Sequence, residues 1–447
     1  METTETKSLD IKINTSSVLK FALPSILSMV IMTTFGMVDG VFISRLIDMY
    51  AFSAMNIAFP ILTTIIAVGF MLATGGSALV AMKKGEGKEV EARENFSFLT
   101  YFSFGFSVIA SILTWIFLEP LLRFLGANES LLPLAKEYIE PIVIGMPIVL
   151  LGFVFQKFFI AEGRPTFAMI VSSSSGVASV FFNFLFIQYL EMGLRGAAIG
   201  TVISYSIPSI IGLIYFSFFR KSGLYFVKSP FVFKVITKST TNGISEFISM
   251  MAVSITATYM NNIVMNLEGP MGVAAIGIMM TTQGLITSMF LGYAFGVSPL
   301  ISFNHGEGNT ENLKKIYSLS LRTIAVLSLI SIVLAIVLAS PLTRVYVSSG
   351  TPVYDMAVFG LRILSIGFVF SAFNVFASNM FVALNNGWVS GVLSFFRTLV
   401  LIQVTLFVFS NLFGMNGVWA AMPLAEVFAM IMTIYYFRKM KARYRYA

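Results

Sequence analysis

The chain has 447 residues, of which 57% are hydrophobic and only 11% are charged, and its formal net charge is +8. Soluble proteins carry roughly twice that share of charge, so the composition excludes an ordinary soluble domain and indicates an integral membrane protein. The absence of cysteine excludes disulfides and thiol chemistry, and a single histidine, His305, leaves little room for histidine-based catalysis or a metal site.

Twelve apolar stretches are long enough to cross a bilayer as helices. Such a helix needs about 20 mostly apolar residues, and glycine, proline and charged residues separate one stretch from the next. In chain order the predicted helices are 18–44, 52–81, 96–118, 136–160, 166–189, 196–219, 242–266, 272–303, 316–339, 356–384, 388–411 and 416–437. The first 17 residues are polar and the run that follows lacks a small-residue cleavage site, so we expect no cleavable signal peptide.

Lysine and arginine predict the orientation of these helices. With both termini in the cytoplasm, most of the 29 basic residues fall on the inner side, including Lys157 at the inner end of its helix. The basic residues on the outer side are then Arg45, Arg123, Lys136, Arg195 and Arg344. We therefore expect a multi-pass protein of the cytoplasmic (inner) membrane of a prokaryote. The basic charge is spread over inner loops, which disfavours nucleic-acid binding.

The second half of the chain repeats the first. Residues 76–87 end in a Gly-Glu-Gly turn, and residues 296–308 end in the same turn about 221 positions later. This predicts two six-helix lobes, 1–219 and 242–447, joined by a cytoplasmic linker at 220–241. Membrane proteins built from two copies of one plan usually keep their working site between the copies and move them against each other. The repeat therefore favours a transporter over an enzyme.

Two long segments resemble a known family. The sequence Ser-Pro-Leu-Ile-Ser-Phe-Asn-His-Gly-Glu-Gly-Asn at 298–309 resembles the end of helix 8 in the multidrug and toxic compound extrusion (MATE) family, and residues 414–426 resemble the start of its helix 12. The resemblance covers essentially the whole chain. It implies an all-α, twelve-helix, V-shaped antiporter of the MOP type, which exports organic cations and other amphipathic drugs in exchange for protons or Na⁺.

Within that family the chain looks closer to the DinF- and MepA-like members than to the NorM-like ones. NorM-like members carry an acid deep in helix 7 and another in helix 10. Here Glu246 lies near the cytoplasmic end of helix 7, where we expect an interfacial or gate-closing role, and Asp355 only precedes helix 10. An ion site in the second lobe is therefore not expected to carry over.

Asp39 is the strongest candidate for ion coupling. It lies within an apolar helix, where a charge costs about 2.5–3.5 kcal/mol on insertion scales, so its side chain should face a cavity. It resembles the helix-1 aspartate that the family links to ion coupling, with a proton as the expected ion and Na⁺ as the alternative. A purely structural, hydrogen-bonded carboxylate is the competing interpretation.

Asn183, Thr201 and Ser204 complete the predicted ion-coupling group. Asn183 lies at a depth similar to that of Asp39 and resembles the family's helix-5 asparagine, while the two hydroxyls could add oxygen ligands. Ile187 stands where some members carry a second aspartate, which makes a two-carboxylate sodium site less expected. The alternative for Asn183 is a hydrogen bond between helices.

A helix-internal proline and a pair of charges have structural and functional interpretations. Pro24 removes a hydrogen bond within the first helix, which predicts either a static kink or the bending that some relatives couple to protonation. Arg397 and Glu426 lie at matching depths near the middle of helices 11 and 12, which predicts a buried structural ion pair. In the alternative, Glu426 faces the cavity and attracts cationic substrate.

The predicted substrate cavity combines flexible apolar side chains with a few polar groups. A thioether adapts to many ligand shapes, but packing or helix–helix hydrogen bonding is the competing interpretation for each such residue. The predicted cavity residues are Met37, Gln156, Met280, Gln283, Asn374 and Glu426.

These features favour a proton- or sodium-coupled multidrug efflux antiporter that works by alternating access, as a monomer in the lipid bilayer. The Gly-Glu-Gly turns lack the glycine spacing and the Lys-Ser/Thr of a nucleotide loop, so ATP and cofactors are not expected. The first alternative is a flippase for lipid or lipid-linked oligosaccharide of the same superfamily. A membrane enzyme and a channel are less favoured, because neither clustered ligand residues nor a symmetric filter segment is visible.

Overall fold

The computed structural model describes residues 9–46, 49–218 and 223–447, and it describes their side chains except at 38–46, 49–53 and 56. The first half contains α1 Thr15–Leu46, α2 Met49–Gly85, α3 Glu89–Ile116, α4 Leu118–Phe124, α5 Leu132–Ala161, α6 Pro165–Asn183, the π-helix η1 Phe184–Tyr189 and α7 Gly193–Phe218. The second half contains α8 Phe233–Glu307, α9 Thr310–Tyr346, α10 Pro352–Ala383, α11 Gly387–Phe395, the π-helix η2 Phe396–Leu401 and α12 Ile402–Tyr444.

Ten continuous helical stretches in the described residues are long and apolar enough to cross a membrane, and two of them, with 75 and 58 residues, are long enough to cross it twice. Gly269 and Gly414 interrupt these two stretches with φ angles of 64° and 57°, a region that favours glycine. The chain reverses at both positions, so the expected twelve membrane helices are present. An even number of crossings places Thr15 and Tyr444 at one end of the bundle, called here the terminal end.

The helices are longer than their apolar segments at the terminal end. α2 continues to Gly85, α8 begins at Phe233 within the segment expected as a linker, and α12 continues to Tyr444. A helix satisfies its own backbone hydrogen bonds and need not stop where the apolar side chains do. The short α4 has no counterpart among the predicted elements, because its 7 residues are too few to be recognised as a membrane span.

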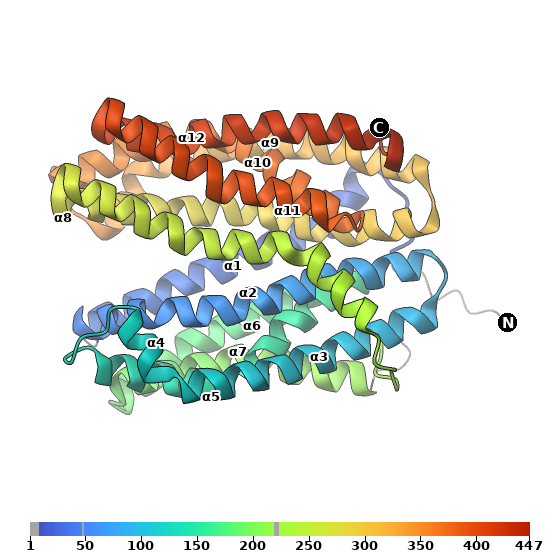
Figure 1. Cartoon of the computed structure of the whole chain (residues 1–447), viewed down its shortest axis with the longest axis horizontal. Helices are drawn as coiled ribbons and strands as arrows, with labels where there is room; N and C mark the ends of the chain where they lie inside the picture. Colours follow the sequence, from blue (N-terminus) through green and yellow to red (C-terminus); the bar gives the residue numbers. More distant parts are fainter. Residues whose placement is uncertain (1–8, 47–48, 219–222) are drawn as a thin grey trace.

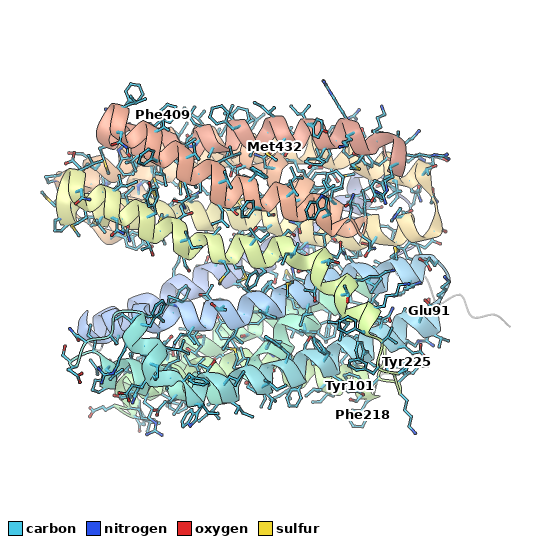
Figure 2. All side chains as sticks on the ribbon, viewed as in Figure 1. Glu91, Tyr101, Phe218, Tyr225, Phe409 and Met432 are labelled. Atoms are coloured by element: carbon cyan, nitrogen blue, oxygen red, sulfur yellow. The ribbon has the colours of Figure 1, made fainter. Side chains whose placement is uncertain are left out.

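The two halves form two layers of helices (Figure 1). Helices α1 to α7, in blue to green, form one lobe, and α8 to α12, in yellow to red, form the other. The stretch that joins them, residues 223–232, is attached to the first lobe. Arg93 donates from Nε to the carbonyl of Gly223 at 2.8 Å. The ring of Phe226 in this stretch lies 5.6 Å from the ring of Tyr101 in α3. Figure 2 labels Tyr101 in the part of the first lobe near the terminal end.

Glycines bring the two lobes into backbone contact near the terminal end. A Cβ on Gly85 would collide with the carbonyl oxygen of Phe303, and one on Gly306 would collide with that of Met82. Glycine is the only residue that permits so close an approach of two main chains. The repeated Gly-Glu-Gly segments of the sequence are therefore the place where α2 and α8 meet.

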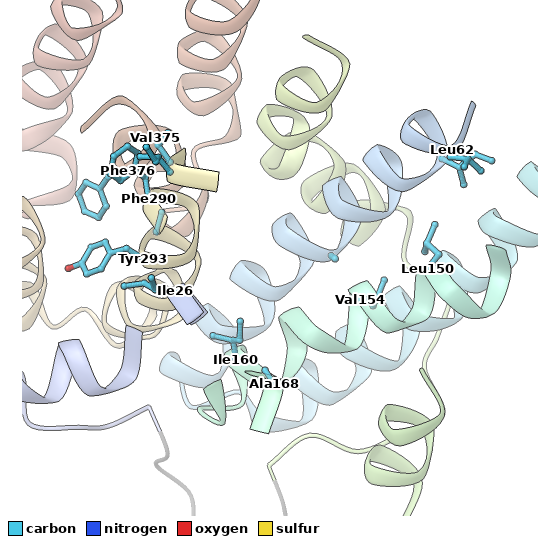
Figure 3. Packing of buried hydrophobic residues seen from close by; sticks show 14 of the residues in the cluster. Ile26, Leu62, Leu150, Val154, Ile160, Ala168, Phe290, Tyr293, Val375 and Phe376 are labelled. Atoms are coloured by element: carbon cyan, nitrogen blue, oxygen red, sulfur yellow. The ribbon is translucent and has the colours of Figure 1, made fainter. Parts of the chain in front are cut away.

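A second set of glycines extends this junction along the helices. Gly243 of α8 abuts the main chain of Met71 in α2, and Gly292 of α8 abuts that of Ile26 in α1. Figure 3 shows Ile26 beside Phe290 and Tyr293 of α8. Farther from the terminal end, however, a Cβ added at Gly284 or Gly277 of α8 would meet no neighbouring atom within 4 Å. The lobes therefore touch at the terminal end and separate toward the opposite end.

Candidate functional site

The first lobe holds a small cavity between α1, α5, α6 and α7. Phe35 of α1 lies against Gly176 of α6, where a Cβ would collide with its ring, so the two helices are in close contact at this level. The cavity has a volume of ≈ 20 Å³, room for about one water molecule. Its lining residues are Met32, Phe35, Val149, Gly152, Phe153, Gln156, Ser172, Ser175, Gly176, Tyr205 and Pro208.

Asp39 lies in α1 one helical turn beyond Phe35, and its side chain is outside the described residues. At 1.5 Å per residue, position 39 lies about 6 Å beyond Phe35 along α1, and Asn183 lies about 10 Å beyond Gly176 along α6. Both helices run away from the terminal end. The contact between Phe35 and Gly176 therefore places positions 39 and 183 within about one turn of the same level.

Asn183 is the last residue of α6 and is 2% exposed. Its Nδ2 donates to Oγ of Ser179 at 3.4 Å. A Cβ on Gly200 of α7 would lie 2.9 Å from its Oδ1, so the amide fills the space that this glycine leaves. The π-helix η1 follows immediately, and π-helical turns are frequent at functional sites. The buried Ile187 lies within that π-turn.

Thr201 and Ser204 lie on the next helix, α7, and both hydroxyl groups are already donors. Thr201 donates to the carbonyl of Ala197 at 3.0 Å, and Ser204 donates to that of Gly200 at 2.6 Å. Each hydroxyl has one hydrogen, so the oxygens remain available only as acceptors or as ligands of a cation. α6 and α7 therefore bring the three predicted polar residues into one region of the first lobe.

The predicted cavity residues do not form one group. Gln156 of α5 lines the small cavity, and its Nε2 donates to Oγ of Ser28 in α1 at 3.1 Å. Met37 of α1 is half-buried. Met280 and Gln283 of α8 are also half-buried, and they lie on the stretch of that helix that has moved away from α1.

Asn374 and Glu426 belong to a closed polar network inside the second lobe. Arg397 of η2 and Glu426 of α12 form the expected ion pair, with Nε and Nη2 donating to Oε1 at 3.0 and 2.8 Å. Their side chains are only 15% and 16% exposed. Asn374 donates to Oε2 of Glu426 at 2.8 Å and accepts from Oγ1 of Thr433 at 2.7 Å. These contacts join α10, η2 and α12.

Lys157 occupies a place that the sequence did not predict. It was counted with the inner-loop charges, but it is only 5% exposed and lies within α5. Its Nζ lies 2.8 Å from the ring centroid of Phe295, which belongs to the other lobe. Its Nζ also lies 5.4 Å from the ring of Phe70 in α2, and Glu246 of α8, itself 8% exposed, follows by three residues the glycine that abuts the neighbouring Met71. The sequence feature that could have indicated this buried position is a lysine flanked by aromatic residues close to the end of a helix.

Comparisons with known proteins agree with this architecture. The MatE family model matches the chain twice, at residues 24–185 and 246–409. Multidrug export protein MepA of Staphylococcus saprophyticus is 24% identical over 409 residues, which cover 91% of this chain and 89% of that protein. MepA of Staphylococcus haemolyticus is 24% identical over 411 residues, which cover 92% and 90%.

A crystal structure of MATE in complex with MaL6 has the same fold, with a TM-score of 0.94, 22% identity and 100% coverage of both chains. The predicted fold, with twelve helices in two lobes, and the MepA-like resemblance are therefore confirmed. The family model covers most of the chain, and both of its matches fall on the helices described above. The chain belongs to the MatE family of multidrug and toxic compound extrusion transporters.

Proposed function

We propose that this chain is a multidrug efflux antiporter coupled to a proton gradient, with Na⁺ as the alternative ion. The observation that carries the proposal is family membership together with similarity, over 91% of the chain, to a protein named multidrug export protein. Its substrates are cationic or amphipathic small molecules. It uses no ATP, cofactor or nucleic acid, and it acts as a monomer.

The lobe arrangement supports alternating access. We place the terminal end in the cytoplasm of a prokaryotic cell, because most lysine and arginine residues outside the membrane segments lie there. The glycine contacts then close the cytoplasmic side, and the separated stretch of α8 around Gly277 and Gly284 opens outward. The two lobes rock against each other about the stretch that precedes α8, as repeats do in such transporters.

Ion coupling is assigned to Asp39, with Asn183, Thr201 and Ser204 as its polar surroundings. Protonation of Asp39 from outside neutralises its carboxylate and favours release of the drug. Pro24 supplies the bending point in α1, since a helix-internal proline lacks one backbone hydrogen bond. It lies between Ala22 and Ile26, which are held against Gly296 and Gly292 of α8, so the bending point lies at the junction of the two lobes.

Substrate contacts are assigned to the helix faces that line the gap between the separated parts of the two lobes. Met37, Met280 and Gln283 lie on the stretches of α1 and α8 that have separated, and Gln156 lines the cavity of the first lobe. The ion pair of Arg397 and Glu426 is assigned the structural role, because Asn374 and other neighbours satisfy it inside the second lobe.

The test is efflux of ethidium from vesicles containing the purified full chain, under a pH gradient and separately under a Na⁺ gradient. Asp39→Asn should abolish gradient-driven efflux while the protein still folds. Glu129→Gln changes an acid that is 84% exposed and serves as the matched control with normal efflux. Unimpaired efflux by Asp39→Asn would contradict the coupling mechanism. If the unmodified protein moves no cation under either gradient, the flippase alternative gains weight.

A further inference from the structure

The side chain of Lys157 extends from the first lobe to contact the second lobe. It lies on α5, and its ammonium group rests over Phe295 of α8, with the ring of Phe70 in α2 5.4 Å away. A cation is attracted to the face of an aromatic ring, and the attraction grows when water is excluded. With the side chain only 5% exposed, the ammonium group depends on these rings and on a nearby acid for its stability.

Glu246 is that acid, and it belongs to the other lobe. It follows Gly243 by three residues in α8, so it lies where α8 is held against the main chain of Met71. Met71 directly follows Phe70, whose ring lies 5.4 Å from Nζ of Lys157, so Glu246 and the ammonium group lie in the same part of the junction between the lobes. Arg397 is already bound through two nitrogens to Glu426, so it cannot fully neutralise a second carboxylate.

Two buried hydroxyl groups without hydrogen-bond partners among the described residues belong to this junction. Ser25 is 3% exposed, its hydroxyl has no partner among the described residues, and it lines a cavity of ≈ 10 Å³ together with Lys157 and Phe295. Ser245, next to Glu246 in the chain, is 1% exposed and equally without a partner within the described part of the chain. An unsatisfied buried polar group costs about 1–3 kcal/mol, which favours a state of the protein in which these groups meet water or a ligand.

We propose that Lys157 is a built-in cation that neutralises Glu246 while the lobes are closed at the terminal end, and that a cationic substrate replaces it when they part. This inference rests on the proposed function and names a binding residue for it. Parting the lobes removes Lys157 from Glu246 and Phe295 together, because both lie on α8. A carboxylate left without its counter-charge in low dielectric is strongly unfavourable, so Glu246 then recruits another cation.

The groups that Lys157 leaves without a cation define the substrate class. They are one carboxylate and the face of Phe295, and the ring of Phe70 lies on the facing lobe. This combination suits an organic cation whose charge is spread over an aromatic or alkylated group. Because this binding site exists only when the lobes are open at the terminal end, the substrate binds that state in preference to the closed one. Such differential affinity is what a ligand needs in order to shift a conformational equilibrium.

The experiment measures equilibrium binding of ethidium to the purified full chain by fluorescence. Glu246→Gln should weaken binding about tenfold, since it removes the counter-charge of the substrate. Lys157→Met should strengthen binding about tenfold, since it removes the internal competitor at nearly constant side-chain size. A merely structural pair would respond differently, because losing either partner would then weaken binding.

Lys84→Met provides the matched control. Lys84 is also buried, at 6% exposed, but its Nζ lies beside Gly223, in the joining stretch that is attached to its own lobe. Its loss should leave ethidium affinity unchanged. If Lys157→Met does not fold, the neutral double variant Lys157→Met with Glu246→Gln takes its place and should bind as Glu246→Gln does.

The possible outcomes distinguish the role of Lys157 and Glu246 from the proposed transport function. Unchanged affinity in Glu246→Gln, weaker or unchanged affinity in Lys157→Met, or wild-type affinity in the double variant would overturn the role of the pair. An unmodified protein that neither binds nor transports ethidium would instead contradict the proposed function. If the unmodified protein transports ethidium and the variants bind ethidium with the same affinity as the unmodified protein, only the role of the Lys157–Glu246 pair is contradicted.

Discussion

Gly85 and Gly306 stand at equivalent positions in the two lobes, and each lies against the main chain of the other lobe. The carbonyl of Phe303 faces Gly85, and that of Met82 faces Gly306, so the contact is the same in both directions. Both carbonyls lie three residues before the glycine of their own helix. The internal repeat of the sequence therefore forms a two-fold related contact that closes the terminal end.

Gly306→Ala should open this contact. The added Cβ collides with the carbonyl of Met82, a main-chain atom that cannot move without its helix. Overpacking of this kind costs about 1–3 kcal/mol, which should favour separated lobes. The chain has no cysteine, so Ser25→Cys provides a single buried label site at this junction. We expect a thiol reagent to label that cysteine several times faster in the Gly306→Ala background.

Gly284→Ala in the same helix is the control for that measurement. Its Cβ position has no atom within 4 Å, so an alanine there meets open space and should leave the labelling rate unchanged. Equal labelling rates for Gly306→Ala and the unmodified background would show that the glycine contact does not hold the lobes together.

Arg397→Met should destabilise the second lobe more than removal of both charges does. The single change leaves Glu426 with Asn374 as a neutral partner but without its cation, and breaking a buried pair costs about 3–5 kcal/mol. The double variant Arg397→Met with Glu426→Gln carries no uncompensated charge and should recover much of that loss. Thermal unfolding in detergent measures both variants.

An exposed ion pair supplies the comparison for this prediction. Lys315 and Glu311 of α9 are 51% and 79% exposed, and surface pairs of this type contribute about 0–1 kcal/mol. Lys315→Met should therefore change the unfolding temperature little. If Arg397→Met behaves like Lys315→Met, the pair in the second lobe is not a structural element.

Gly200→Ala should disturb the predicted ion-coupling group without changing any polar residue. Its Cβ would lie 2.9 Å from Oδ1 of Asn183, so the amide must rotate or move. If the position of Asn183 matters for coupling, gradient-driven ethidium efflux should fall at least several-fold while the unfolding temperature changes by only a few degrees. The rate of efflux at fixed protein content is the measurement.

Gly105→Ala is the matched control, because this glycine of α3 also lies in a membrane helix and has no atom within 4 Å of its Cβ position. Its efflux should equal that of the unmodified protein. Normal efflux in Gly200→Ala would remove Asn183 from the coupling group and leave it as a link between α6 and α7.

Much of the fold could be predicted because membrane helices are encoded locally. A run of about 20 apolar residues suffices to define a crossing, and Gly269 and Gly414 mark reversals that the sequence placed to within a few residues. The helix ends at the terminal side were wrong by up to nine residues, as at Phe233, because polar residues continue a helix beyond the hydrocarbon. The pairing of Arg397 with Glu426 was accessible because depth along a helix follows from sequence position.

By itself the sequence determined the membrane class, the number of crossings, the two-fold repeat and the matching depths of Arg397 and Glu426, since hydrophobic length and spacing are properties of the chain alone. Only the tertiary structure decided which residues meet across the lobes. Lys157 and Phe295 are far apart in sequence, and their contact depends on helix rotation and on how closely the glycines let the lobes approach. Those quantities arise from packing between distant segments, which no local pattern encodes.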